Sequence, residues 1–130
     1  MNILALDIGL RRTGISYGET KSGIVIALDT MQHTTPEELS EQVKIIVKSK
    51  KIDHVIIGLP LLPSGLEGEQ VSLVKAAAKM IENESGLTPE FLDERYTTKI
   101  HFSARGSDPD ATAACALLTV WLDRKNAIDI

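Results

Sequence analysis

The chain has 130 residues, of which 43% are hydrophobic, 25% are charged and 4% are aromatic, so one domain spanning residues 1–130 with a mainly aliphatic core is expected. Its formal net charge of -4 argues against a protein that holds nucleic acid by bulk electrostatic attraction. No apolar run approaches the roughly 18 to 20 residues that cross a bilayer, and no signal peptide pattern is present, so we expect a cytoplasmic protein without membrane contact.

Three β-strands are predicted at the start of the chain. Met1–Ile8 is an apolar run that Asp7 interrupts near its end, which is typical of a buried strand. Thr13–Tyr17 and Gly23–Leu28 are rich in β-branched residues and are separated by a short polar break, which favours an antiparallel meander. The first strand is therefore expected to end in a carboxylate beside a turn.

The next segment predicts a helix, a strand and a second helix. Thr35 and Glu38 form a capping box around a proline at the first helical position, so a helix is expected over Pro36–Lys50. Asp53–Ile57 predicts a short apolar strand. A second helix is indicated by apolar residues at helical spacing, namely Val74, Ala77, Ala78 and Ile81. This alternation favours parallel crossover connections.

The chain is expected to end in a short strand and a long helix. Glu90–Asp93 is the strand candidate, and Asp108 with Pro109 provides an N-cap and a first helical residue. The apolar face of this helix is expected to consist of Ala113, Ala114, Leu117, Leu118, Trp121 and Leu122. The whole pattern predicts an α/β fold with a mixed five-stranded sheet flanked by helices. Its first three strands would be antiparallel and two further strands parallel, with the first and the late strands at the centre.

Three acidic residues lie at the ends of predicted elements, namely Asp7, Glu94 and Asp110. The carboxyl ends of parallel strands share one edge of an open α/β sheet, so the three side chains are expected to converge there. Asp110 is the most informative, because it shares a helix face with the apolar Ala113 and Ala114. A carboxylate that points inward needs a hydrogen bond, an ion pair or a cation.

Each acid also has a simpler explanation. Asp110 would complement the dipole of its own helix, and Asp7 would accept hydrogen bonds from a turn. Glu94 would pair with Arg95 or with a surface lysine. Taken together, however, three carboxylates suit a hard divalent cation, and such ions support phosphodiester hydrolysis. A bound cation would also let a net acidic protein accept a nucleic acid substrate.

Four short motifs resemble those of one family. They are Leu6-Asp7-Ile8-Gly9 with Arg11, Arg12 and Gly14; Gly58-Leu59-Pro60 with Gly65, Gly68 and Gln70; Asp93-Glu94-Arg95 with Thr97-Thr98; and Asp110 with Ala113-Ala114 and Leu122-Asp123. In this order, and over nearly the whole chain, they resemble the YqgF/RuvX family of the RNase H-like superfamily. The resemblance implies an RNase H-like fold and a nuclease that matures the 5′ end of pre-16S rRNA.

The same resemblance implies roles for individual residues. Asp7, Glu94 and Asp110 would be the catalytic acids that bind Mg²⁺ or Mn²⁺. The phosphate contacts would come from basic residues near the acids, namely Arg11, Arg12, Arg95 and Lys99. Ordinary surface solvation is the alternative for the arginines, and for Arg11 it explains the residue at least as well. The expected partners are structured RNA or branched DNA and ribosome precursors, with the protein acting as a monomer or a homodimer.

One departure from the family pattern leaves the substrate open. Family members carry a longer basic segment before the last aspartate, whereas only Lys99–Pro109 intervenes here. Within it, residues Ser103–Ser107 are expected to form an active-site flap. The alternatives are a nuclease of the Holliday junction resolvase type and a non-catalytic ribosome-assembly or transcription-linked module. A kinase-like phosphate loop is a third alternative, but it requires two lobes and this chain is too short for them.

The remaining polar and reactive residues are expected to be structural. His33, His54 and His101 share no metal-ligand spacing, so we expect them at the surface or at a boundary. Trp121 is expected in the core rather than as a platform for base stacking. Cys115 has no cysteine partner and is expected to be a small core residue, which excludes a disulfide and structural zinc.

Overall fold

The computed structural model describes residues 1–60, 64–93 and 109–128. Its strands are β1 (Asn2–Ile8), β2 (Arg12–Glu19), β3 (Val25–Gln32), β4 (His54–Leu59) and β5 (Glu90–Asp93). Its helices are α1 (Pro36–Ser49), α2 (Glu69–Ser85) and α3 (Pro109–Ile128). All eight elements occur where the sequence predicts them. None of the described helices combines the length and the apolar content that a membrane span requires.

The strands form one mixed five-stranded sheet in the order β3-β2-β1-β4-β5. β1 is antiparallel to β2, β2 is antiparallel to β3, and β1, β4 and β5 are parallel. The predicted sheet is therefore confirmed, except that β5 lies at an edge and not at the centre. The reason is that α1 leads to β4, which lies beside β1, and α2 leads to β5, which lies beyond β4. The carboxyl ends of β1, β4 and β5 consequently share one edge of the sheet.

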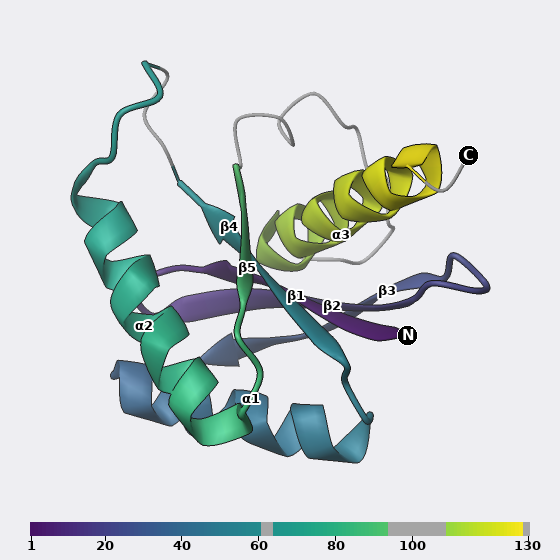
Figure 1. Ribbon diagram of the computed structural model, residues 1–130. Helices are drawn as coiled ribbons and strands as arrows, with labels where there is room; N and C mark the ends of the chain where they lie inside the picture. Colours follow the sequence, from purple (N-terminus) through teal and green to yellow (C-terminus); the bar gives the residue numbers. More distant parts are fainter. Residues whose placement is uncertain (61–63, 94–108, 129–130) are drawn as a thin grey trace.

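Helices cover both faces of the sheet, with α1 and α2 on one face and α3 on the other (Figure 1). Alternate residues of β1 supply the two core layers. Leu4 and Leu6 pack with the α1 and α2 side, whereas Ile3 and Ala5 pack with α3. The α3 layer is a smaller cluster of Ile3, Ala5, Ile56, Leu92, Leu117, Leu118, Val120 and Leu122. Cys115 is 1% exposed, as its prediction as a core residue requires.

At the start of α1 the predicted N-cap is confirmed, but the Glu38 carboxylate binds a different residue from the one predicted. The Thr35 side chain accepts a hydrogen bond from the Glu38 backbone N–H at 3.2 Å. In the predicted capping box, the Glu38 carboxylate would in turn bind the Thr35 N–H. It instead accepts from the backbone N–H of Thr34 at 3.0 Å and from the Thr34 hydroxyl at 2.7 Å. The carboxylate therefore fixes the segment that joins β3 to α1.

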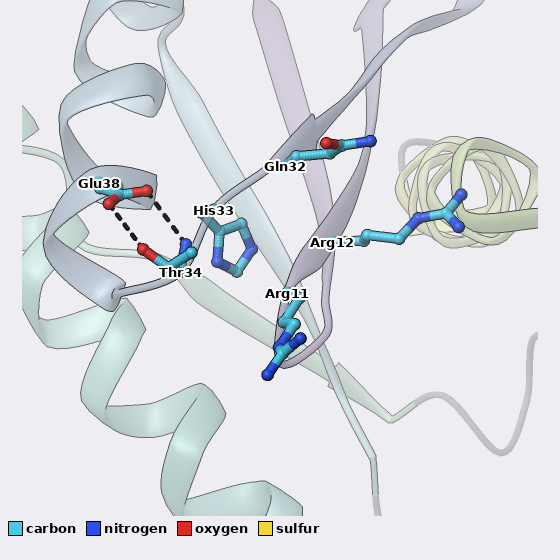
Figure 2. Close-up of a pocket in the computed structure, with 6 residues that line it drawn as sticks. All are labelled: Arg11, Arg12, Gln32, His33, Thr34 and Glu38. Atoms are coloured by element: carbon cyan, nitrogen blue, oxygen red, sulfur yellow. Dashed lines mark hydrogen bonds between the residues drawn. The ribbon is translucent and has the colours of Figure 1, made fainter.

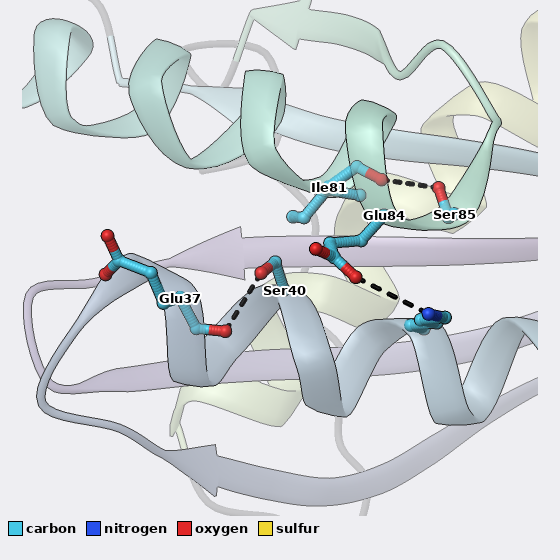
Figure 3. A network of polar contacts seen from close by, with 6 residues as sticks. Glu37, Ser40, Ile81, Glu84 and Ser85 are labelled. Atoms are coloured by element: carbon cyan, nitrogen blue, oxygen red, sulfur yellow. Dashed lines mark hydrogen bonds and ion pairs between the residues drawn. The ribbon is translucent and has the colours of Figure 1, made fainter.

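Polar contacts lie within and between α1 and α2 (Figure 3). The Ser40 hydroxyl donates to the Glu37 carbonyl at 2.9 Å, and the Ser85 hydroxyl donates to the Ile81 carbonyl at 2.6 Å. Lys44 and Glu84 join the two helices through an exposed ion pair of 3.5 Å. An exposed pair of this kind contributes little stability, so the apolar layer beneath holds the helices together.

Candidate active site

Asp7 lies at the carboxyl end of β1, on the face that α3 covers. Strand alternation places it on the same side as Ile3 and Ala5, both of which pack against α3. It is half-buried, and its partner in β2 is Gly14. Because glycine has no side chain, Gly14 places none of its own beside the carboxylate.

Two contacts fix the register of α3 on β2. The Ser16 hydroxyl donates to the Ala114 carbonyl at 2.8 Å, and a Cβ added at Gly18 would lie 2.7 Å from Leu118 Cδ2. From Ser16 to Gly18 the strand advances about 6.8 Å, and from Ala114 to Leu118 the helix advances about 6 Å. The two elements therefore advance by nearly the same distance from one contact to the next. One further step back leads to Gly14 in β2 and to position 110 in α3.

A tight turn joins β1 to β2 beside Asp7. The Gly9 N–H donates to the Arg12 carbonyl at 2.9 Å, and a Cβ at Gly9 would lie 2.6 Å from that oxygen. Only glycine fits so close an approach of the backbone. The turn carries Arg11 and Arg12, which are both exposed. In Figure 2 the Arg12 side chain extends toward α3 and Arg11 points in another direction.

The two arginines line a shallow depression together with Gln32, His33, Thr34 and Glu38 (Figure 2). His33 is 6% exposed, so the prediction that it lies at the surface or at a boundary is wrong. Its Nε2 and the Thr13 hydroxyl share a buried hydrogen bond of 2.7 Å, which compensates for the loss of water. Burial lowers the pKa of His33, and the nearby Glu38 carboxylate opposes part of this shift.

The predictions for His54 and Trp121 concern a cluster at the other end of the parallel strands, away from Asp7. His54 is half-buried and lies 3.2 Å from a Glu90 carboxylate oxygen, which agrees with a boundary position. The Trp121 Nε1–H donates to the other Glu90 oxygen at 2.9 Å. The Trp121 ring packs against the core beneath α3 but is only half-buried, so it lies at the boundary and not in the core as predicted. His101 lies outside the described residues.

The structure brings Asp7, Arg11 and Arg12 to one edge of the sheet. Glu94, Arg95 and Lys99 lie outside the described residues, as does the predicted flap Ser103–Ser107. Asp110 is described only as a backbone position in the first turn of α3. Asp93, which directly precedes Glu94, pairs with Leu59 at the same edge as Asp7. Among the side chains that the structure describes, no three acidic, histidine or cysteine groups lie close enough to hold a metal ion.

Sequence reasoning missed His33, Gln32 and Thr34 as neighbours of the arginines. The available signal was weak, because Thr13 is one of several polar residues in β2 and His33 follows β3 by a single position. Their contact spans 20 positions and arises only when β2 and β3 pair.

Known proteins similar to this chain agree on one family. A family model described as "RuvX: Holliday junction resolvase" matches residues 1–124. A Sulfurihydrogenibium sp. protein named "Putative pre-16S rRNA nuclease" is 30% identical, over 94% of this chain and 90% of its own length. A protein of the same name from Chloroflexus aurantiacus is 32% identical over 74% of this chain, and the match spans 63% of the relative.

A solved structure supports the same fold. The RuvC protein of Thermus thermophilus superposes with a TM-score of 0.70 over 98% of this chain and 97% of that chain, at 12% sequence identity. At this identity the likeness concerns the fold alone, and it agrees with the predicted RNase H-like architecture. The family model covers nearly all of the sequence. The chain therefore belongs to the RuvX family.

Proposed function

We propose that this protein is a metal-dependent endonuclease that hydrolyses phosphodiester bonds during 5′-end processing of pre-16S rRNA. Membership of the RuvX family and the names of the relatives support the reaction and the substrate. The observation that carries the proposal is the register of α3 on β2, because one further step of that register leads to position 110 and to Gly14, the β2 partner of Asp7. Residues 1–130 would act as one catalytic domain.

Asp7, Glu94 and Asp110 are proposed to hold the divalent cation. Asp7 offers a half-buried carboxylate on the α3 face, and Asp110 lies in the first turn of α3. Glu94 directly follows β5, whose carboxyl end lies at the same edge. Ligands that are all carboxylate oxygens fit Mg²⁺ or Mn²⁺ better than softer metals. When bound, the ion would activate a water molecule and stabilise the leaving oxygen.

The basic residues near the acidic site would bind and orient the nucleic acid. Arg12 lies on the face of the sheet that carries Asp7 and extends toward α3 (Figure 2). A guanidinium there can hold a phosphate through two hydrogen bonds next to the acidic site. Arg11 would contact a phosphate farther along the strand, and Arg95 and Lys99 are proposed to add contacts. Local basic groups of this kind let a chain with a net charge of -4 bind structured RNA in ribosome precursors.

Branched DNA is the second candidate substrate. The description of the family model favours it, and so does a structure of Thermus thermophilus RuvC in complex with a Holliday junction substrate, which superposes with a TM-score of 0.69. The assay therefore compares cleavage of an RNA that contains the 5′ leader of 16S rRNA with cleavage of a four-way DNA junction, each in Mg²⁺ and in Mn²⁺. Faster cleavage of the junction would transfer the proposal to DNA.

The decisive variant is Asp7→Asn, which keeps the size of the side chain and removes its charge. We expect cleavage to fall by at least about 100-fold, because loss of a metal ligand should exceed the loss caused by an outer-shell partner. Asp29→Asn is the matched control, since Asp29 is an exposed acid on β3. It should cleave like the unaltered protein.

Two outcomes would reject the proposal. Equal cleavage by the Asp7→Asn protein would identify a contaminating nuclease. Normal rRNA processing in cells that carry only the Asp7→Asn, Glu94→Gln double variant would favour a non-catalytic assembly module instead.

A further inference from the structure

His33 contacts the arginine-bearing turn from beneath. Its backbone N–H donates to the Arg11 carbonyl at 3.0 Å, and its ring shares the 2.7 Å hydrogen bond with the Thr13 hydroxyl. Arg11 and Thr13 are the two neighbours of Arg12 in the sequence. One residue at the end of β3 therefore holds the chain on both sides of Arg12.

Both ends of the ring contact are shielded from water. Thr13 is fully buried, and His33 is 6% exposed. In a site of low polarity, a hydrogen bond is electrostatically stronger than in water and fixes its partners more firmly. The side chains of Arg11 and Arg12, in contrast, are exposed and point in different directions (Figure 2). The backbone of the turn is thus anchored beneath two exposed arginine side chains.

The ring itself is poorly suited to bind a phosphate. Its Nδ1 is buried and has no hydrogen bond partner among the described residues. Protonation would leave this nitrogen as an unpaired charged donor, and two arginines lie around the same depression. Glu38 is the only acidic residue that lines the depression as described, and its carboxylate is already bound by Thr34.

We propose that His33 is a positioning residue that holds the Arg11–Arg12 turn in the orientation required for contact with backbone phosphates. The inference rests on the proposed function, because it assumes a nucleic acid ligand at this edge. Holding the turn in advance reduces the conformational entropy that binding would otherwise cost. His33 would thus govern substrate affinity and leave the hydrolytic step unchanged.

The test compares His33→Leu, which removes the ring hydrogen bond, with His33→Gln, whose amide can bond to Thr13. His54→Leu is the matched control, because His54 lies at the opposite end of the parallel strands. Binding of the RNA and of the DNA junction is measured by fluorescence anisotropy in Mg²⁺ at several salt concentrations, with Asp7→Asn added to every protein. KM and kcat are measured separately with Asp7 intact.

In His33→Leu we expect Kd and KM to rise about tenfold, as the loss of one charge-assisted contact between an arginine and a phosphate predicts. The slope of log affinity against log salt concentration should become shallower, by the amount that corresponds to the loss of about one phosphate contact. The value of kcat should stay within about twofold, and His33→Gln should regain most of the affinity. His54→Leu should bind like the unaltered protein.

Three results separate this inference from the proposed function. Unchanged affinity and salt slope in His33→Leu, or equal losses in the leucine and glutamine variants, would overturn the positioning role alone. Binding that depends on His33 without any cleavage would overturn the nuclease proposal alone. Failure of the protein to bind either nucleic acid would overturn both.

Discussion

At the scale of single residues, Thr13 and His33 show how a polar pair is kept inside an apolar layer. Each residue loses its contact with water, and the hydrogen bond between them compensates only in part, because Nδ1 of His33 has no partner among the described residues. Burial disfavours the charged imidazole and lowers the pKa of His33. The folded protein therefore binds this proton less readily than the unfolded chain.

This shift predicts how stability depends on pH. Above the ordinary histidine pKa of about 6.5, both states hold His33 neutral, and the protein keeps its full stability. As the pH falls below that value, the unfolded chain takes up the proton first, and the free energy of unfolding decreases. We expect His33→Gln to lose less stability than the unaltered protein between about pH 7.5 and about pH 5.5, a range above the ordinary pKa of carboxyl groups.

Urea unfolding at the two pH values measures the difference. Comparison with His33→Gln removes the contributions of the other two histidines, since both proteins contain them. Equal losses of stability in the two proteins would show that His33 titrates as it does in the unfolded chain.

At the scale of elements, the contact between α3 and β2 places the helix relative to Asp7. Gly18 allows this contact, because a Cβ there would lie 2.7 Å from Leu118 Cδ2 and 3.0 Å from the Ile24 carbonyl oxygen. The leucine can rotate, but the backbone oxygen cannot move without disturbing β3. The helix therefore lies on the sheet as closely as glycine permits.

Gly18→Ala should consequently lower the free energy of unfolding by about 1 to 3 kcal/mol, the usual cost of overpacking. It should also reduce cleavage, because α3 would have to shift relative to Asp7. Gly23→Ala is the control, since it strains a backbone with a φ of 72° but places its Cβ in open space. It should destabilise the protein while leaving cleavage unchanged in the folded state. Urea unfolding measures the stability of each variant, and the RNA assay measures its cleavage. Full stability of Gly18→Ala would contradict the described packing.

Local signals made the elements predictable from the sequence. Thr35 and Pro36 fixed the start of α1, and the alternation of apolar residues identified the strands, because caps and alternation act between near neighbours. The burial of α3 was less predictable. Its buried residues include Ala116 and Val120 beyond the predicted apolar face, because the helix contacts four strands whose order the sequence does not encode locally.

At the scale of the whole molecule, the candidate site depends on contacts between distant parts of the chain. Asp7 was predictable, because an acid at the end of an apolar strand stands out and parallel strands share a carboxyl edge. The role of His33 was not predictable, since its contact with Thr13 requires the pairing of β2 with β3, whose register shifts between Thr13 and Ile15. The hydrogen bond from Ser16 to Ala114, which spans 98 positions, likewise depends on the completed fold.

The central claim is that Asp7, Glu94 and Asp110 together hold a divalent cation, and crystals soaked in Mn²⁺ test it most directly through anomalous scattering. The account predicts an anomalous peak bound by these three carboxylates, and its loss in crystals of the Asp7→Asn protein. A peak held by other residues, or no peak at Asp7 under conditions in which the protein cleaves RNA, would contradict it.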